Sequence, residues 1–136
     1  MQELLRRALE YYRNGDDDAA VAAIGEITEP LLPSVTELYR NEIDPDLRAF
    51  LVRVAWERRE PGSVEFILEA LDDPAEEVWQ SALDGTVALA SPEMLDMLQT
   101  AKSRERADAA STRRFQICID EAILYVEGLL QAGQRR

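Results

Sequence analysis

Prolines recur along this sequence at a spacing close to 30 residues, and this spacing most constrains the possible fold. Pro30, Pro61 and Pro92 are separated by 31 and 31 residues, and Pro45 and Pro74, each preceded by Asp, by 29. A proline inside a helix costs about 3 kcal/mol, whereas the first turn tolerates it because that N–H has no helical partner. The spacing therefore predicts a repeated unit of two helices, with prolines at the helix starts.

The segment Ala70–Lys102 shows one helix, a turn and a second helix most clearly. Asp73-Pro74 is expected to start the first helix with Asp73 as its N-cap, and Ser91-Pro92 the second. Residues at three- and four-residue spacing share one face of the first helix: Val78, Ala82, Thr86 and Leu89. Neither helix buries its apolar stripe alone, so each unit needs a similar neighbour on either side.

Gly85 lies inside the first helix of this segment, where Gly costs about 1 kcal/mol relative to Ala. We expect a close crossing by a neighbouring helix to be the reason for the glycine. No window alternates apolar and polar residues over the length of a strand. The predicted fold class is therefore all-α, an α-α superhelix in which about four antiparallel helix pairs stack as a short right-handed solenoid.

The repeat spacing divides the chain into four units of a single domain. The units are expected at about 1–28, 30–59, 61–90 and 92–131 of one domain, 1–131, followed by a tail at 132–136. The last unit is irregular, with a polar connector at Ser103–Ser111 and a long apolar helix at Thr112–Leu130. Such irregularity is typical of a terminal unit, which caps the stack.

The turns within the middle units resemble those of HEAT-like repeat proteins. In this family a helix ends in leucine and is followed by an Asp-Pro turn and a helix carrying Val-Arg and Ala-Leu pairs. Here Leu71-Asp72-Asp73-Pro74 is followed by Val78-Trp79 and Ala82-Leu83. The preceding copy has Ile43-Asp44-Pro45 followed by Leu47-Arg48.

The resemblance covers about residues 30–101 and implies an α-solenoid that mostly serves as a scaffold for protein binding. The chain departs from the family pattern at Trp79, where the family usually carries arginine, so the usual Asp–Arg ladder is not expected in full for this unit. The size, the HEAT-like unit and the absence of catalytic groups also look similar to immunity proteins, which neutralise bacterial toxins. Fold and function are separable, so these remain expectations.

Acidic residues dominate the charge and give a net charge of −12. Such a field repels nucleic acid and attracts a basic partner. Ten acids and no basic residue lie within 60–101, and two helix stripes there form the candidate partner surface. The candidate residues are Glu65 and Glu69 on one stripe, and Glu77, Gln80 and Asp84 on the other. A plain solvated face is the alternative that the sequence leaves open.

The sequence carries no motif for chemistry. It contains no histidine, which removes the commonest general base and the usual nucleophile pairs. Pairs of carboxylates such as Glu57 and Glu60 arise by chance among 27 acids. Aspartates at 16–18 lack the spacing of an EF-hand and suit a helix start. We therefore expect a protein that is not an enzyme and binds no cofactor or metal.

An alternative function is that of an enzyme accessory or lyase-type protein, with a small molecule in a concave groove. Trp56 or Trp79 lining a pocket would favour it, although both are expected to pack in the core. Cys118 is expected to be a buried, inert thiol, and a single cysteine suits a reducing compartment. Charges within Met1–Tyr12 argue against a signal peptide, and no apolar run reaches about 18 residues. The sequence thus predicts a cytoplasmic protein without a membrane span.

Overall fold

The computed structural model describes residues 3–134, and all regular secondary structure within that range is helical. The described residues form eight helices: α1 (Glu3–Arg13), α2 (Asp17–Gly25), α3 (Leu32–Asn41), α4 (Pro45–Arg58), α5 (Ser63–Ala70), α6 (Glu76–Ala88), α7 (Pro92–Ala101) and α8 (Ala109–Gln134). The predicted all-α class is confirmed. None of the helices in this range has the length and apolar character needed to cross a membrane.

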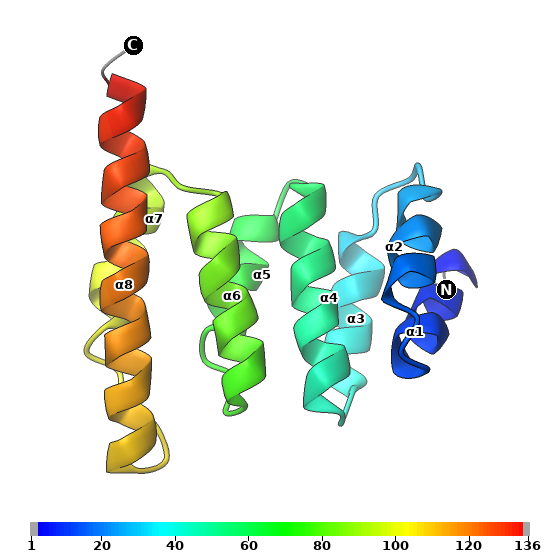
Figure 1. Ribbon diagram of the computed structural model, residues 1–136, viewed down its shortest axis with the longest axis horizontal. Coiled ribbons are helices and arrows are strands. Elements are labelled where there is room, and N and C mark those ends of the chain that lie inside the picture. The colour runs from blue at the N-terminus through cyan, green and yellow to red at the C-terminus, as the bar shows by residue number, and fades with distance from the viewer. Residues whose placement is uncertain (1–2, 135–136) are drawn as a thin grey trace.

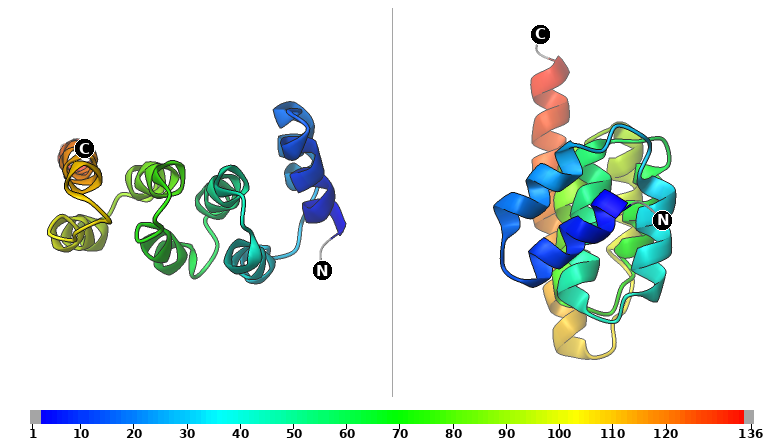
Figure 2. Two further views of the ribbon diagram at one scale, coloured as in Figure 1. Left: turned by 90° about the horizontal axis from the view of Figure 1, so that it is seen from below. Right: turned by 90° about the vertical axis from the view of Figure 1, so that its right-hand side faces the viewer.

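Consecutive helices pack in pairs, α1 with α2, α3 with α4, α5 with α6, and α7 with α8. Helices α4, α6 and α8 lie side by side in the front layer, and α3, α5 and α7 lie behind them in the rear layer (Figure 1; Figure 2, left). The α1–α2 pair is tilted relative to the other helices (Figure 2). Each front helix therefore contacts both its own partner and the neighbouring front helices.

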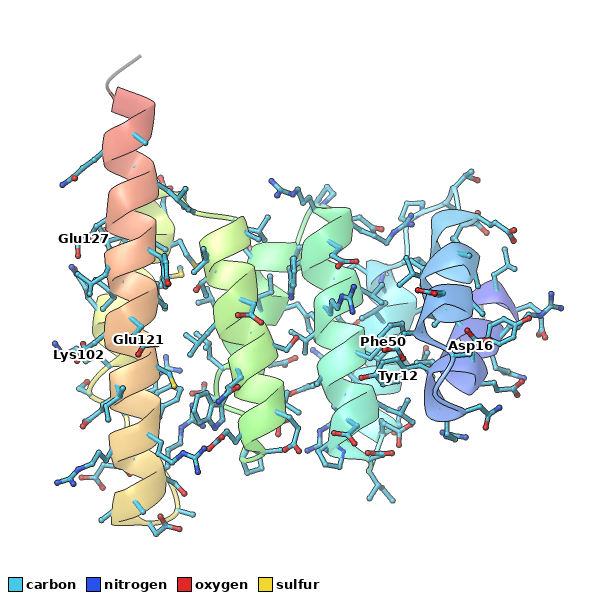
Figure 3. All side chains as sticks on the ribbon, viewed as in Figure 1. Tyr12, Asp16, Phe50, Lys102, Glu121 and Glu127 are labelled. Carbon is cyan, nitrogen blue, oxygen red and sulfur yellow. The ribbon has the colours of Figure 1, made fainter. Side chains whose placement is uncertain are left out.

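Buried side chains from every helix, from Leu5 in α1 to Val126 in α8, join in one hydrophobic core. Aromatic contacts link neighbouring pairs at three points, one of which is the edge-to-face contact of Tyr39 on α3 with Phe66 on α5, with centroids 5.1 Å apart. Tyr12 of α1 stacks on Phe50 of α4 with ring centroids 4.3 Å apart (Figure 3). Trp79 of α6 meets Phe115 of α8 edge to face, with centroids 5.2 Å apart. Such pairs add about 0.5–1.5 kcal/mol beyond the burial of their area.

The prolines mark helix starts, although not all in the way expected. Pro45 and Pro92 occupy the first turns of α4 and α7, and the side chains of Asp44 and Ser91 cap these helices. The other three repeat prolines each precede the first helical residue by two positions: Pro30, Pro61 and Pro74. Their rigid backbone therefore shapes the turn before the helix rather than its first turn.

Asp73 is not the N-cap predicted from the Asp-Pro sequence, because α6 begins at Glu76 with Ala75 as an N-cap that makes no side-chain bond. Instead the Asp73 carboxylate is buried and accepts two hydrogen bonds from the Arg48 guanidinium, each 3.1 Å long. It also accepts 2.6 Å and 2.9 Å bonds from the Tyr39 hydroxyl and the Ala75 N–H. The carboxylate thus joins α3 and α4 to the turn before α6.

This buried cluster shifts the pKa values of the Asp73 carboxyl and the Tyr39 hydroxyl. Burial alone would raise the pKa of Asp73, but the hydrogen bonds from Arg48, Tyr39 and Ala75 outweigh burial and hold it below the ordinary value. Burial raises the pKa of the Tyr39 hydroxyl, and its hydrogen bond to Asp73 adds to the rise. Asp73 is therefore ionised and Tyr39 protonated across the physiological pH range.

Three arginines donate hydrogen bonds to backbone carbonyls at helix ends and in the turns that follow them. Arg48 donates to carbonyls after α3, Arg58 to carbonyls at the end of α2, and Arg106 to carbonyls after α5. Glu60 has the opposite role at the start of α3, because its carboxylate accepts 2.9 Å hydrogen bonds from the N–H groups of Leu31 and Leu32. Charged side chains from the loops and front helices thus hold the helix termini in place.

Arg106 places a guanidinium near Trp79, the position at which the third unit lacks the arginine of the family pattern. Trp79 stands 31 residues after Arg48, at the corresponding position of the next front helix. Arg106 comes from the connector before α8, and its guanidinium carbon lies 3.7 Å from the Phe115 ring centroid and 5.9 Å from that of Trp79. The chain thus supplies the guanidinium from a later segment while a tryptophan fills the helix position.

The expected close crossing at Gly85 is confirmed. A Cβ atom built on Gly85 would lie 2.9 Å from Cδ1 of Trp56 on α4 and 3.0 Å from Cδ1 of Ile67 on α5. The indole of Trp56 is rigid, so it cannot relieve such a contact by moving one end of the side chain alone. The glycine therefore lets α4 and α5 approach α6, although it weakens the helix locally.

The predicted ends of the chain need correction. Helix α8 covers 109–134, so it begins before and ends after the expected helix at 112–130, and the expected tail at 132–136 starts inside it. The remaining tail residues, 135–136, and the first two residues of the expected first unit lie outside the described residues.

Gly85→Ala is expected to destabilise the protein by up to about 2 kcal/mol, because overpacking costs about 1–3 kcal/mol and the helix-propensity gain offsets about 1 kcal/mol of it. Gly128→Ala is the matched control, since Gly128 also lies inside a helix but has nothing within 4 Å of the added Cβ. Urea denaturation should show a loss of stability for Gly85→Ala and a gain for Gly128→Ala. Gains for both would show that α4 does not crowd Gly85.

Asp73→Ala is expected to cost about 3–5 kcal/mol, because it leaves the guanidinium of Arg48, whose side chain is 16% exposed, without its carboxylate. Asp44→Ala is the control, since Asp44 occupies the equivalent Asp-Pro turn but only caps α4, a role worth about 1 kcal/mol. Chemical denaturation of both variants tests the difference. Equal losses would contradict the role given to Asp73.

Acid should weaken the fold through Asp73 in particular. Because its folded-state pKa is depressed, its stabilisation is complete above the unfolded-state pKa of about 3.9. That contribution is lost as the pH falls below this value and through the folded-state pKa. Urea melts between about pH 7 and pH 3 should show a steeper fall in unfolding free energy for the wild-type chain than for Asp73→Asn. Parallel curves would contradict the expectation.

Candidate partner-binding surface

The structure divides the five candidate residues between two layers. Glu65 and Glu69 lie on α5 in the rear layer, whereas Glu77, Gln80 and Asp84 lie on α6 in the front layer. All five side chains are exposed, as the helical pattern predicted. The structure thus brings three of the candidates together on one helix and places the other two on a helix of the other layer.

The rear stripe has the features of an ordinary solvated face. Glu69 forms an ion pair of 3.2 Å with Arg40 of α3, and both side chains are largely exposed. Asp72, just after α5, similarly pairs with Arg104 of the connector. Exposed pairs of this kind contribute about 0–1 kcal/mol. Charges of both signs therefore lie near the rear stripe. The apolar hollow between α5 and α7 also carries both signs, because Asp96 and Arg104 both line it.

The front stripe borders a groove between α6 and α8, which we call the α6–α8 groove. It has a volume of about 260 Å³. Its lining residues are Gln80, Leu83, Asp84, Val87, Cys118, Glu121, Ala122 and Tyr125. Apolar side chains come from both helices, and each helix contributes one carboxylate, Asp84 from α6 and Glu121 from α8. Figure 3 shows Glu121 on the front face of α8.

Arginines hold some of the carboxylates near the groove. Glu57 pairs with Arg53 at 2.8 Å, and Glu76 pairs with Arg114 across α6 and α8. Glu60, which the sequence offered as a partner for Glu57, pairs instead with an arginine at the end of α4. Within the described part of the chain, five front-layer acids make no hydrogen bond or ion pair through their side chains, and two of them, Asp84 and Glu121, line the α6–α8 groove. The other three are Asp46, Glu77 and Glu127.

The α6–α8 groove alters the titration of two groups that line it. Partial burial raises the pKa of the Asp84 carboxyl, with no hydrogen bond to oppose it. Burial raises the pKa of the Cys118 thiol, and the negative charges of Glu121 and Glu76 add to the rise. Cys118 is half-buried at the groove rather than fully buried as expected, and it stays a protonated thiol at neutral pH. A basic group placed beside the unpaired carboxylate of Asp84 would therefore stabilise its ionised form.

An exposed apolar strip continues the groove along α8. Tyr125 and Leu129, which define this apolar strip, follow Glu121 at four-residue spacing and are 67% and 51% exposed. By helical spacing Leu129 shares a face with Phe115, Ala122 and Val126, which are buried, yet Leu129 is exposed. The reason is that α8 extends beyond the end of α6, so its last turns have no front-layer neighbour (Figure 1).

Sequence reasoning missed Glu121 and Tyr125 as surface residues of the candidate site. The four-residue spacing of Glu121, Tyr125 and Leu129 was visible, but only the lengths of α6 and α8 show that this stripe is uncovered. Neither tryptophan lines the groove, since Trp79 is buried at 3% exposure and Trp56 packs against Gly85. No group of three or more acidic or cysteine side chains is placed to hold a metal ion within residues 3–134, and Asp16 caps α2.

Comparison of this chain with models of known protein families, with curated proteins and with solved structures finds no match. The chemistry of the α6–α8 groove is therefore the basis for the functional proposal.

Proposed function

We propose that this chain is a non-catalytic protein-interaction module, an adaptor or an immunity-type inhibitor, that binds a basic protein partner through the α6–α8 groove. The observation that carries the proposal is the pair of unpaired carboxylates, Asp84 from α6 and Glu121 from α8, that line an open and partly apolar groove. A basic side chain placed there pairs the charges while its stem covers the apolar floor. The net charge of −12 steers such a partner toward the chain.

We further propose that the scaffold is a single HEAT-like domain, a short solenoid of four antiparallel helix pairs. The pairwise packing of consecutive helices supports this. So does the bond between Arg48 of one pair and Asp73 of the next, which is the kind of Asp–Arg contact the family resemblance implies. Repeat arrays of this kind present extended surfaces for binding. The small-molecule alternative lacks similar support, because neither tryptophan lines the groove.

Reversing the two groove carboxylates, Asp84→Lys with Glu121→Lys, is expected to slow association at least about tenfold, because steering charges act mainly on the on-rate. Glu3→Lys with Glu10→Lys on α1 is the control, since both residues are exposed and far along the chain from the groove. Each double variant changes the net charge from −12 to −8. The association rate is measured against a basic protein recovered by pull-down with the wild-type chain.

The control separates a local surface from the bulk field of the protein. A local groove predicts slower association for the groove variant only, and stronger salt dependence for the wild type than for that variant. Equal association rates for both variants would contradict the proposal and leave the groove as solvated surface. Circular dichroism of each variant verifies that the fold is intact.

A further inference from the structure

We infer that the segment bound in the α6–α8 groove is a basic amphipathic helix of the partner. Its basic side chains lie against Asp84 and Glu121, and its apolar side chains cover Tyr125 and Leu129, about one and two helical turns further along. The inference rests on the proposed function, since it names the kind of segment that the acidic groove receives.

The first support is the order of chemistry along α8. Glu121, Tyr125 and Leu129 follow one another at four-residue spacing, so they share one stripe of the helix. The eight residues from Glu121 to Leu129 span about 12 Å along the axis. Charge therefore lies at one end of the stripe and exposed apolar surface at the other, where Tyr125 is 67% and Leu129 is 51% exposed. A purely basic segment would leave the apolar strip uncovered.

The second support is the match between helical rises. A partner helix lying along α8 advances about 1.5 Å per residue, as α8 does, so side chains at i, i+4 and i+8 meet successive groups of the stripe. Recognition of a helix in a groove uses anchors at this spacing. An extended segment advances about 3.3 Å per residue and would cross the same distance in four residues, with alternate side chains pointing away. The α6–α8 groove therefore favours a helix.

The third support is charge, which also decides against a second copy of this chain. The groove lining contains two carboxylates and no lysine or arginine. Two copies packed groove to groove would place these unpaired carboxylates opposite each other. Arginine is the best-suited basic residue for the occupant, because its planar guanidinium binds a carboxylate through two hydrogen bonds and stacks on the face of a tyrosine such as Tyr125.

Two synthetic helical peptides of identical composition test the inference. Each has about 18 residues, long enough to form a helix alone, and carries two arginines and two leucines in an alanine-rich background. In the matched peptide the arginine pair and the leucine pair lie on one face, two turns apart. In the split peptide the leucines lie on the face opposite the arginines. Fluorescence anisotropy at about 150 mM salt, where bulk charge is screened beyond about 8 Å, gives both dissociation constants.

We expect the matched peptide to bind the wild-type chain at least about tenfold more tightly than the split peptide. Leu129→Ser should abolish this difference while leaving the split peptide unaffected. Leu124→Ser is the control, since Leu124 is 70% exposed on α8 but lines a hollow beside α7 instead of the groove. It should leave both dissociation constants unchanged. Asp84→Lys with Glu121→Lys should weaken both peptides.

The outcomes separate this inference from the proposed function. Equal binding of both peptides, with both lost on reversal of Asp84 and Glu121, would overturn the helical occupant and leave the basic partner standing. The inference would be overturned if neither peptide binds, or if the reversal of Asp84 and Glu121 leaves peptide binding unchanged. If that reversal also leaves the association rate of the natural partner unchanged, the proposed function would be wrong as well. Light scattering that shows wild-type dimers disrupted by Leu129→Ser would overturn the inference in favour of a second copy.

Discussion

The arrangement of the middle of this protein depends on one buried carboxylate. Asp73 binds the guanidinium of Arg48 and the hydroxyl of Tyr39, so a turn in one helix pair is fixed to both helices of the pair before it. Hydrophobic contacts between helices allow sliding, because they have no preferred direction. A two-pronged bond between a guanidinium and a carboxylate has a defined geometry and sets the distance and orientation between pairs. The positions of α4 and α6, and thus of the groove beside α6, follow from it.

The sequence was sufficient for the features that local chemistry determines. Prolines and apolar spacing located the helices, and Gly85 correctly indicated a close crossing. Long-range partners were beyond its reach. Asp73 has the same local sequence as a helix cap, and only the proximity of Arg48, 25 residues earlier, makes it an ion-pair partner. Likewise, the position of Arg106 in the connector could not show that it would reach the ring of Phe115.

The candidate surface shows the same division between local and long-range information. Helical periodicity correctly predicted that all five candidate acids and amides are exposed. It could not show that α5 and α6 lie in different layers, or that arginines neutralise Glu69 and Glu76 and leave Asp84 unpaired. The charges that line each hollow, rather than exposure, distinguish the two surfaces. The α6–α8 groove is lined by two carboxylates and no basic residue, whereas Asp96 and Arg104 both line the hollow of the rear layer. Glu121 became part of the surface only because α8 packs beside α6.

Arg48 and Arg106 approach the α5–α6 pair from opposite ends of the stack, and this has a consequence for how the protein opens. Arg48 holds the turn before α6 from α4, and Arg106 holds carbonyls of the same turn from the connector before α8. That pair therefore cannot fray without breaking charged bonds on both sides. The α1–α2 and α7–α8 pairs each have a neighbour on one side only. Local unfolding should thus begin at these two outer pairs, with amide protons of α6 among the last to exchange with solvent.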